Sequence, residues 1–266
     1  MSVGSRRRAA LTRAELLREM GLARPWRLRE KRPAAGTVLT PSADEVVECH
    51  RPAGLDPPPA ADRRAEIAAL DWPQLRQSVA DCRACGLCRE RRQAVLGVGD
   101  VNADWLFIGE GPGAEEDARG EPFVGPAGKL LDAMLAAIDL RRGDDVYIAN
   151  AVKCRPPGNR TPEAAEMAAC APYLNRQIAL IQPRLIVLLG RAAANSVLGE
   201  VGSLASLRGR SLTYRGALPG GPEIPVVVTY HPAYLLRTML DKARAWEDLC
   251  RARALWRAVR AAPPPG

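Results

Sequence analysis

Seven cysteines occur in the 266-residue sequence, and four of them form two pairs that could hold a metal centre. Two residues separate Cys82 from Cys85, and fifteen separate Cys154 from Cys170. Four thiolates in two pairs can bind a zinc ion or an iron–sulfur cluster. Zinc ribbons usually repeat the short spacing, which the second pair does not, whereas a four-iron cluster is larger and tolerates separated ligands. The spacing therefore favours an iron–sulfur cluster.

Cys88 extends the first pair to Cys-x2-Cys-x2-Cys, which is how a ferredoxin-type run begins. The fourth cysteine of such a run is replaced by Arg92, and Gln93 stands where proline would follow. The sequence therefore does not support a ferredoxin-type run. Cysteines that serve a metal, in a chain without a secretory signal, indicate a reducing compartment. No apolar run is long enough for a membrane helix, so a membrane-spanning protein is not expected.

A glycine-rich turn, GEGPGAEED at 109–117, follows an apolar run. Glycine lets the backbone approach a ligand closely and present N–H groups to it. The turn lacks the Gly-Lys-Ser/Thr ending of a phosphate-binding loop, and its acidic side chains would repel phosphate. This turn favours a neutral planar ligand, although a purely structural turn would have the same composition.

Three further residues have types and positions suited to binding a base. Phe123 lies between Pro and Gly in a predicted loop, where its ring could stack on a base or anchor the loop in the core. Asn150 ends a second apolar run, and its amide complements the O4/N3–H edge of uracil but not the amino group of cytosine. Capping the next turn is the ordinary alternative for this Asn. His231, one of only two histidines, directly follows a fourth apolar run.

The elements that must position these residues alternate between strand and helix. Buried strands are predicted at Trp105–Gly109, Val146–Ala151, Leu185–Leu189 and Val226–Thr229. Helices are predicted at 126–139, 162–181, 191–198 and 241–261, and a helical pattern also covers 62–81. The alternation predicts a three-layer α/β/α sandwich around a four-stranded parallel sheet. Because ligands bind at the carboxyl ends of such strands, the turn at 109, Asn150 and His231 should meet there.

The basic charge is concentrated at the amino terminus. Residues 1–32 hold ten Lys and Arg against three Asp and Glu, whereas the whole chain has a net charge of +8. A short helix is predicted at 12–21, and the Pro/Ala-rich segment 33–60 is typical of a linker or a disordered segment. We therefore expect a basic, partly disordered arm at 1–60 and a catalytic domain at 61–262. Such an arm could bind DNA or remain a solvated tail.

In order along the chain, these segments resemble the motifs of the uracil-DNA glycosylase superfamily, specifically its family-4 (iron–sulfur) enzymes of bacteria and archaea. The resemblance covers roughly residues 75–260. It rests on the paired cysteines, GEGPGAEED at 109–117, PFVGPAGKLLD at 122–132, NAVKCRPPGNRTP at 150–162 and HPAYLL at 231–236.

The resemblance implies an enzyme of base excision repair that hydrolyses the N-glycosidic bond of flipped-out deoxyuridine, releasing uracil and leaving an abasic site. The implied ligands of a [4Fe–4S] cluster are Cys82, Cys85, Cys154 and Cys170. The implied uracil pocket consists of Gly109, Glu110, Gly111, Phe123, Asn150 and His231. The implied catalytic residues are His231 together with Glu110 or Glu116, and which carboxylate orients water stays open. The implied DNA contacts are Lys153, Arg155, Arg160, Pro232, Ala233 and Tyr234.

The expected partner is uracil-containing DNA, single- or double-stranded, bound by a monomer in the bacterial cytosol at the nucleoid. The arm could also bind a repair or replication protein. Relatives that bind DNA covalently carry a long, basic, His-containing insertion in the motif that corresponds to residues 150–162. Here Lys153 is followed directly by Cys154, which favours an enzyme that releases its product. The alternatives are a non-catalytic or covalent uracil-DNA-binding protein and, less favoured, an iron–sulfur redox protein.

Overall fold

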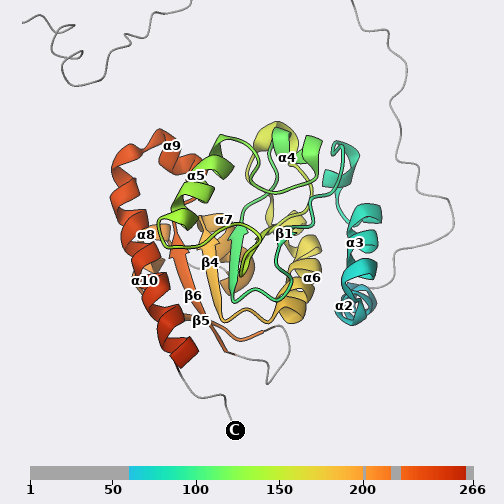
Figure 1. The fold of residues 1–266 in the computed structure, drawn as a ribbon. Helices are drawn as coiled ribbons and strands as arrows, with labels where there is room; N and C mark the ends of the chain where they lie inside the picture. Colours follow the sequence, from blue (N-terminus) through green and yellow to red (C-terminus); the bar gives the residue numbers. More distant parts are fainter. Residues whose placement is uncertain (1–59, 200–201, 217–222, 262–266) are drawn as a thin grey trace, which may run out of the picture. The chain divides into compact units, whose positions relative to one another are not determined.

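The four predicted apolar runs form the parallel centre of a six-stranded sheet in the order β1-β3-β2-β4-β6-β5 (Figure 1). The computed structural model describes residues 60–199, 202–216 and 223–261. The central strands are β2 (Trp105–Gly109), β3 (Val146–Asn150), β4 (Leu185–Leu189) and β6 (Ile224–Thr229). Every residue of β2, β3 and β4 is buried. Burial on both faces explains why these strands are continuous apolar runs rather than alternating patterns.

The prediction of a four-stranded sheet was wrong, because two antiparallel edge strands complete it. β1 (Val98–Gly99) pairs with β3, and β5 (Leu212–Tyr214) pairs with β6. These strands have two and three residues, and only Tyr214 among them is buried. Such short and largely uncovered segments contain no hydrophobic periodicity that a sequence pattern could detect.

Helices cover both faces of the sheet, and successive residues of β2 show how the two layers are separated. Trp105 and Phe107 pack with α5 (Pro126–Ala136) and α10 (Lys242–Ala261) on one face. Leu106 and Ile108 pack with α6 (Ala164–Ile181), α7 (Arg191–Leu198) and the short α8 (Leu204–Leu207) on the other. The two cores result from the alternation of side chains along a strand.

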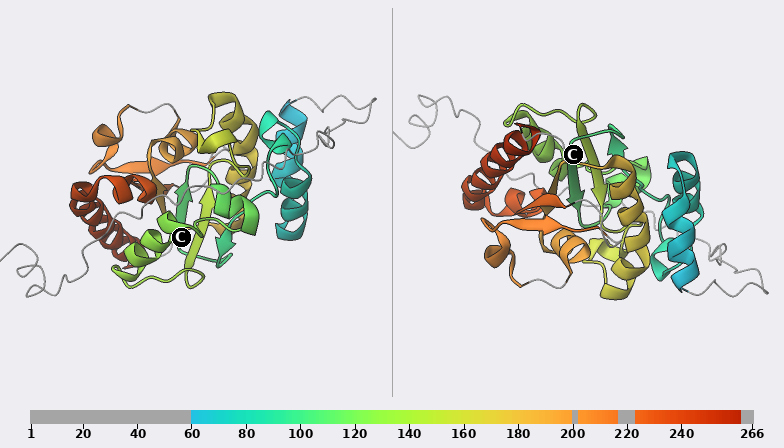
Figure 2. Two further views of the ribbon diagram at one scale, coloured as in Figure 1. Left: turned by 90° about the horizontal axis from the view of Figure 1, so that it is seen from above. Right: turned by 90° about the horizontal axis from the view of Figure 1, so that it is seen from below.

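The helical pattern predicted at 62–81 divides into two helices, α2 (Ala60–Ala69) and α3 (Trp72–Asp81). Asp71 begins α3, and its side chain accepts a hydrogen bond from the Gln74 main-chain N–H at 2.9 Å. The Gln74 side chain in turn accepts a bond from the Asp71 main-chain N–H. This capping box ends one helix pattern and starts the next. Both helices lie beside α6, on the side of the molecule away from α10 (Figure 2).

Short helices follow three of the central strands at their carboxyl ends. α4 (Ala114–Arg119) follows β2, the 3₁₀ turn η2 (Pro157–Asn159) follows β3, and α9 (Pro232–Arg237) follows β6. Two other 3₁₀ turns are η1 (Gly86–Arg89) and η3 (Met239–Asp241). The predicted helix at 12–21, the linker up to residue 59 and the basic arm lie outside the described residues. No helix in the described ranges is both long and apolar enough to cross a membrane.

Candidate active site

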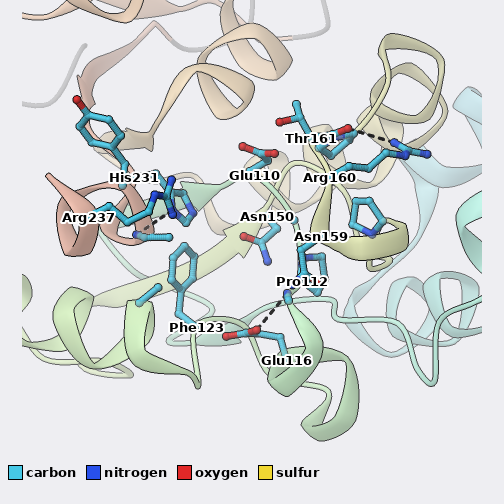
Figure 3. Close-up of a pocket in the computed structure, with 17 residues that line it drawn as sticks. Glu110, Pro112, Glu116, Phe123, Asn150, Asn159, Arg160, Thr161, His231 and Arg237 are labelled. Carbon is cyan, nitrogen blue, oxygen red and sulfur yellow. Dashed lines mark hydrogen bonds between the residues drawn. The ribbon is translucent and has the colours of Figure 1, made fainter. Parts of the chain in front are cut away.

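A cavity of about 480 Å³ opens at the carboxyl edge of the central strands (Figure 3). This volume lies within the range typical of small-molecule sites. Backbone hydrogen bonds from the Ala151 N–H to the Gly109 carbonyl (2.9 Å) and from the Val152 N–H to the Glu110 carbonyl (3.2 Å) join the loops after β2 and β3. Nine of the residues predicted from the sequence line the cavity: Glu110, Gly111, Glu116, Phe123, Asn150, Arg160, His231, Ala233 and Tyr234.

Asn150 stands at the last position of β3, and its side chain points into this cavity (Figure 3). The residue is only 2 % exposed, and its amide oxygen Oδ1 has no hydrogen-bond partner in the structure. A buried amide oxygen without a partner costs roughly 1–3 kcal/mol. The unpaired oxygen therefore fits a ligand that brings an N–H donor to this point.

Phe123 lies on one wall of the cavity with its backbone in the left-handed region, at φ 56°. Its ring is 6 % exposed and packs in the core that α5 and α10 share, so the ring both anchors the loop and lines the cavity. Gly109 lies next to the Phe123 ring. A Cβ at Gly109 would stand 2.5 Å from both the Phe123 ring and the Asn150 amide oxygen, so only glycine leaves these two side chains in place.

His231 caps the amino terminus of α9 and faces the Phe123 ring, with 5.4 Å between the ring centroids. The His231 Nδ1 accepts a hydrogen bond from the Ala233 N–H at 3.2 Å. Burial, helped by the positive charge of Arg237, lowers the His231 pKa from 6.5 to about 4. The imidazole is therefore neutral at pH 7, and because Nδ1 is an acceptor, its proton sits on Nε2.

The two candidate carboxylates have different surroundings. Glu116 accepts backbone N–H bonds from Gly113 (3.0 Å), Val124 (2.9 Å) and Gly125 (3.1 Å), so both its oxygens hold the loops that frame Phe123. Glu110 lines the cavity, and burial raises its pKa, although a hydrogen bond with Thr161 opposes that shift. These contacts leave Glu110 as the carboxylate available to a ligand.

The basic residues expected to contact DNA are placed in different ways. Lys153 is 1 % exposed, and its ammonium donates to the Asn150 carbonyl (2.8 Å) and to Gln177, so it does not reach the surface. Arg155 lies outside the cavity and donates to the side chain of Asn159 at 2.7 Å. Arg160 lines the cavity but forms a two-pronged ion pair with Glu166 at 2.7 and 2.8 Å.

Arg237 lines the cavity beside His231, and the sequence analysis missed it (Figure 3). The signal that could have found it is Pro232, which favours the first position of a helix. A helix starting there places Ala233 and Arg237, four residues apart, on one face. Both residues line the cavity, whereas Pro232 is buried and does not line it.

The four paired cysteines lie together between the end of α3 and α6, around a pocket that shares no lining residue with the cavity. Cys82, Cys85, Cys154 and Cys170 all line one small pocket, and none forms a disulfide. Within the described ranges, no three His, Cys, Asp or Glu side chains are grouped closely enough for a single metal ion. Burial raises the pKa of Cys154 to about 12 and that of Cys170 to about 11.

Three of the four sulfur atoms nevertheless accept an N–H hydrogen bond. The Cys154 Sγ accepts from Arg91 at 2.9 Å, and the Cys170 Sγ accepts from the Lys153 main chain at 3.3 Å. The Cys82 Sγ accepts a longer bond from Arg63 at 3.7 Å. Donors directed at three of the four sulfurs suit thiolates that bind an iron–sulfur cluster.

The sequence also matches a family of known proteins. The profile of the uracil DNA glycosylase superfamily matches residues 96–250. The type-4 uracil-DNA glycosylase of Sulfurisphaera tokodaii is 44 % identical over 186 residues, covering 68 % of this chain and 83 % of that protein. The type-4 enzyme of Thermotoga maritima is 43 % identical over 181 residues (67 % and 91 %), and that of Pyrobaculum aerophilum 40 % over 182 residues (68 % and 92 %). The chain belongs to the uracil DNA glycosylase superfamily.

Proposed function

We propose that this protein is a DNA repair enzyme that hydrolyses the N-glycosidic bond of deoxyuridine, releasing uracil and leaving an abasic site. The observation that carries the proposal is the buried, unpaired amide oxygen of Asn150 at the cavity. Uracil offers an N–H donor at N3 beside an acceptor at O4, which matches the two ends of this amide. In the same pose cytosine would turn the N3 lone pair toward Oδ1 and its amino donor toward the amide NH2, so neither hydrogen bond would form. The names of the superfamily and of the relatives support the same activity.

The base must leave the helical stack before it can enter this cavity. Flipping a nucleotide costs a few kcal/mol and is cheapest at a mismatch such as U·G. Phe123 would stack on the flipped base, and stacking of this kind is worth about 1–3 kcal/mol. Asn150 would then read the O4/N3–H edge, and Gly109 keeps the space that both side chains need.

In the chemical step, the bond between N1 of uracil and C1′ of the sugar breaks, and its electron pair leaves with the base. Negative charge then grows on uracil O2 while the sugar becomes positive. The Nε2–H of neutral His231 and the N–H groups near Gly111 would donate to O2 and stabilise this charge. A donor of this kind is worth about 2.7–4 kcal/mol.

Water completes the reaction by adding to C1′ and giving up a proton, and the departing uracil anion takes up a proton, so that the overall reaction balances. We assign its orientation to Glu110, because both oxygens of Glu116 already accept main-chain N–H bonds. Glu116 instead positions the loop that carries Phe123. Glu110 also places negative charge close to the sugar at the point where positive charge develops.

The DNA would lie across the carboxyl edge of the sheet, near Tyr234 and Arg237 of α9. Leu240, in the turn that follows α9, is 91 % exposed, and an exposed apolar side chain there could wedge between bases in the minor groove. Residues 1–60 would tether the protein to single- or double-stranded DNA, with 61–262 as the catalytic domain. This role assumes a monomer acting in the bacterial cytosol, at the nucleoid.

A [4Fe–4S] cluster held by Cys82, Cys85, Cys154 and Cys170 is part of this proposal. The four thiols line one pocket, and three of the sulfurs accept an N–H hydrogen bond, which supports the fit. Iron would offset the cost of burying thiolates, which is otherwise high at Cys154 and Cys170. Hydrolysis needs no electron transfer, so the cluster would join the segment after α3 to the loop between β3 and α6.

Two experiments test the proposal. Incubation with a U·G duplex should produce free uracil and an alkali-labile abasic site, and a protein that only binds the duplex would contradict the assigned reaction. Purified protein should contain about four iron atoms per chain. Cys154→Ser should lose the iron and the visible absorbance, whereas Cys88→Ser should keep both. Loss of iron in Cys88→Ser would mean that the ligand set is wrong.

A further inference from the structure

Arg91 connects the two cysteine pairs. One guanidinium nitrogen, Nη1, donates to the Cys154 Sγ at 2.9 Å, and the other, Nη2, donates to the Cys82 carbonyl at 3.0 Å. The same side chain reaches the carbonyls of Val79 and Ala80 in the last turn of α3. Arg91 therefore touches a cysteine of each pair, although Cys82 and Cys154 are 72 positions apart in sequence.

The guanidinium also complements the charge around it. The last carbonyls of a helix carry partial negative charge, and a cation placed there stabilises the helix end. An arginine fork can bond several acceptors at once in a fixed geometry, which a lysine cannot do. Arg63 is the other arginine at a cysteine sulfur among the described residues, but its distance from the Cys82 Sγ is 3.7 Å. The shorter contact makes Arg91 the stronger electrostatic partner.

We propose that Arg91 is a positioning residue for the iron–sulfur cluster, clamping the Cys82 segment against Cys154 and placing a fixed positive charge on one cluster thiolate. This inference rests on the cluster proposed above. Hydrogen bonds to the sulfurs and the net charge nearby set how readily such a cluster accepts an electron. A cation at Cys154 stabilises the reduced cluster, which carries one more negative charge.

Two consequences follow for variants of Arg91. Removal of the charge in Arg91→Met should shift the one-electron equilibrium toward the oxidised cluster by about tenfold, which corresponds to about 59 mV. The same variant should release iron to a chelator several times faster. Arg91→Lys keeps the charge but loses the fork, so it should retain most of the potential while still releasing iron faster.

The test compares wild type, Arg91→Met, Arg91→Lys and Arg89→Met by electrode titration of the cluster and by loss of its visible absorbance in excess chelator. Arg89 is exposed and lies two positions away on η1, so its variant controls for the removal of a nearby charge. Circular dichroism establishes that each variant is folded. If Arg91→Met does not fold, Arg91→Lys alone tests the clamp through its rate of iron release.

The outcomes separate this inference from the proposal on which it rests. If wild-type protein contains no iron, the cluster proposal is overturned, and Arg91 has no cluster to position. A second outcome is that the wild type contains iron and that Arg91→Met and Arg91→Lys match it in potential and in iron release. That outcome would overturn the role of Arg91 and leave the cluster in place. A change of equal size in Arg89→Met would also overturn it, because the effect would then be one of general charge.

Discussion

The Ala233 N–H donates to the His231 Nδ1 at 3.2 Å, so that the first turn of α9 determines which nitrogen of the imidazole carries the proton. His231 is also the cap of that helix, and its pKa is lowered to about 4. The residue therefore faces the cavity as a neutral donor through Nε2. Within the proposed mechanism, this tautomer is what allows the side chain to stabilise charge on uracil O2.

The His231 pKa predicts how stability depends on pH. The unfolded state has the ordinary value of 6.5 and the folded state about 4, so the unfolded protein binds more protons between these values. Stability due to neutral His231 is present above pH 6.5 and is lost as pH falls toward 4, by at most ~3 kcal/mol. Denaturant unfolding should show that the free energy of unfolding falls less between pH 7.5 and pH 5 in His231→Gln than in wild type. Equal losses in the two proteins would contradict the buried, neutral imidazole.

Asn150→Asp tests the reading of the base. The carboxylate would present two acceptors, one of them against uracil O4, in a position that is 2 % exposed. A two-point contact to a base edge is worth about 1–3 kcal/mol, so single-turnover excision should fall roughly 10- to 100-fold. Asn102→Asp makes the same change at an exposed turn and serves as the control. Unchanged excision by a folded Asn150→Asp protein would remove Asn150 from the pocket.

Gly109→Ala tests the space behind the base. The added Cβ would stand 2.5 Å from the Asn150 Oδ1 and from the Phe123 ring, so at least one of the two side chains must move. Displacement of binding groups by about 1 Å can cost on the order of 100-fold in rate, and we expect a loss of that size. At Gly86 a new Cβ would meet nothing within 4 Å, so Gly86→Ala should fold and excise uracil normally. Full activity in Gly109→Ala would show that the base binds elsewhere.

Removal of the arm should change DNA affinity but not chemistry. The ten basic residues within 1–32 precede every proposed active-site residue, which all lie beyond position 100. A protein that begins near residue 60 should keep single-turnover excision at saturation and bind duplex DNA less tightly. Each lost phosphate contact lowers the slope of log K against log salt by about 0.9. Equal slopes would mean that the arm is not a DNA tether, and lost excision would mean that it is part of the catalytic domain.

The parts of the fold that the sequence predicts are those determined by local pattern. β2 and β4 were predicted residue for residue, because a fully buried parallel strand is a continuous apolar run. The edge strands were missed, since Val98–Gly99 and Leu212–Tyr214 are too short for any periodicity. The break at Asp71 was missed as well, although its capping box with Gln74 is a local signal.

The candidate site shows the same division between local and distant information. Asn150 and His231 could be selected because Asn150 ends one apolar run and His231 lies two positions beyond another, so that both reach the carboxyl edge. The burial of Lys153 could not be predicted, because its partner Gln177 lies 24 positions away in the chain. Likewise, Glu116 was distinguishable from Glu110 only once its bonds to the main chain of Val124 and Gly125 were visible.

The central claim is that this site breaks the bond between uracil and deoxyribose, and the most direct measurement is the release of labelled uracil from a U·G duplex by excess protein in a single turnover. We predict free uracil in amounts equal to the abasic sites formed, with protein that dissociates intact from the product DNA. Asn150→Asp should release it far more slowly under the same conditions. A duplex that is bound without release of uracil, or a stable covalent complex between protein and DNA, would contradict this account.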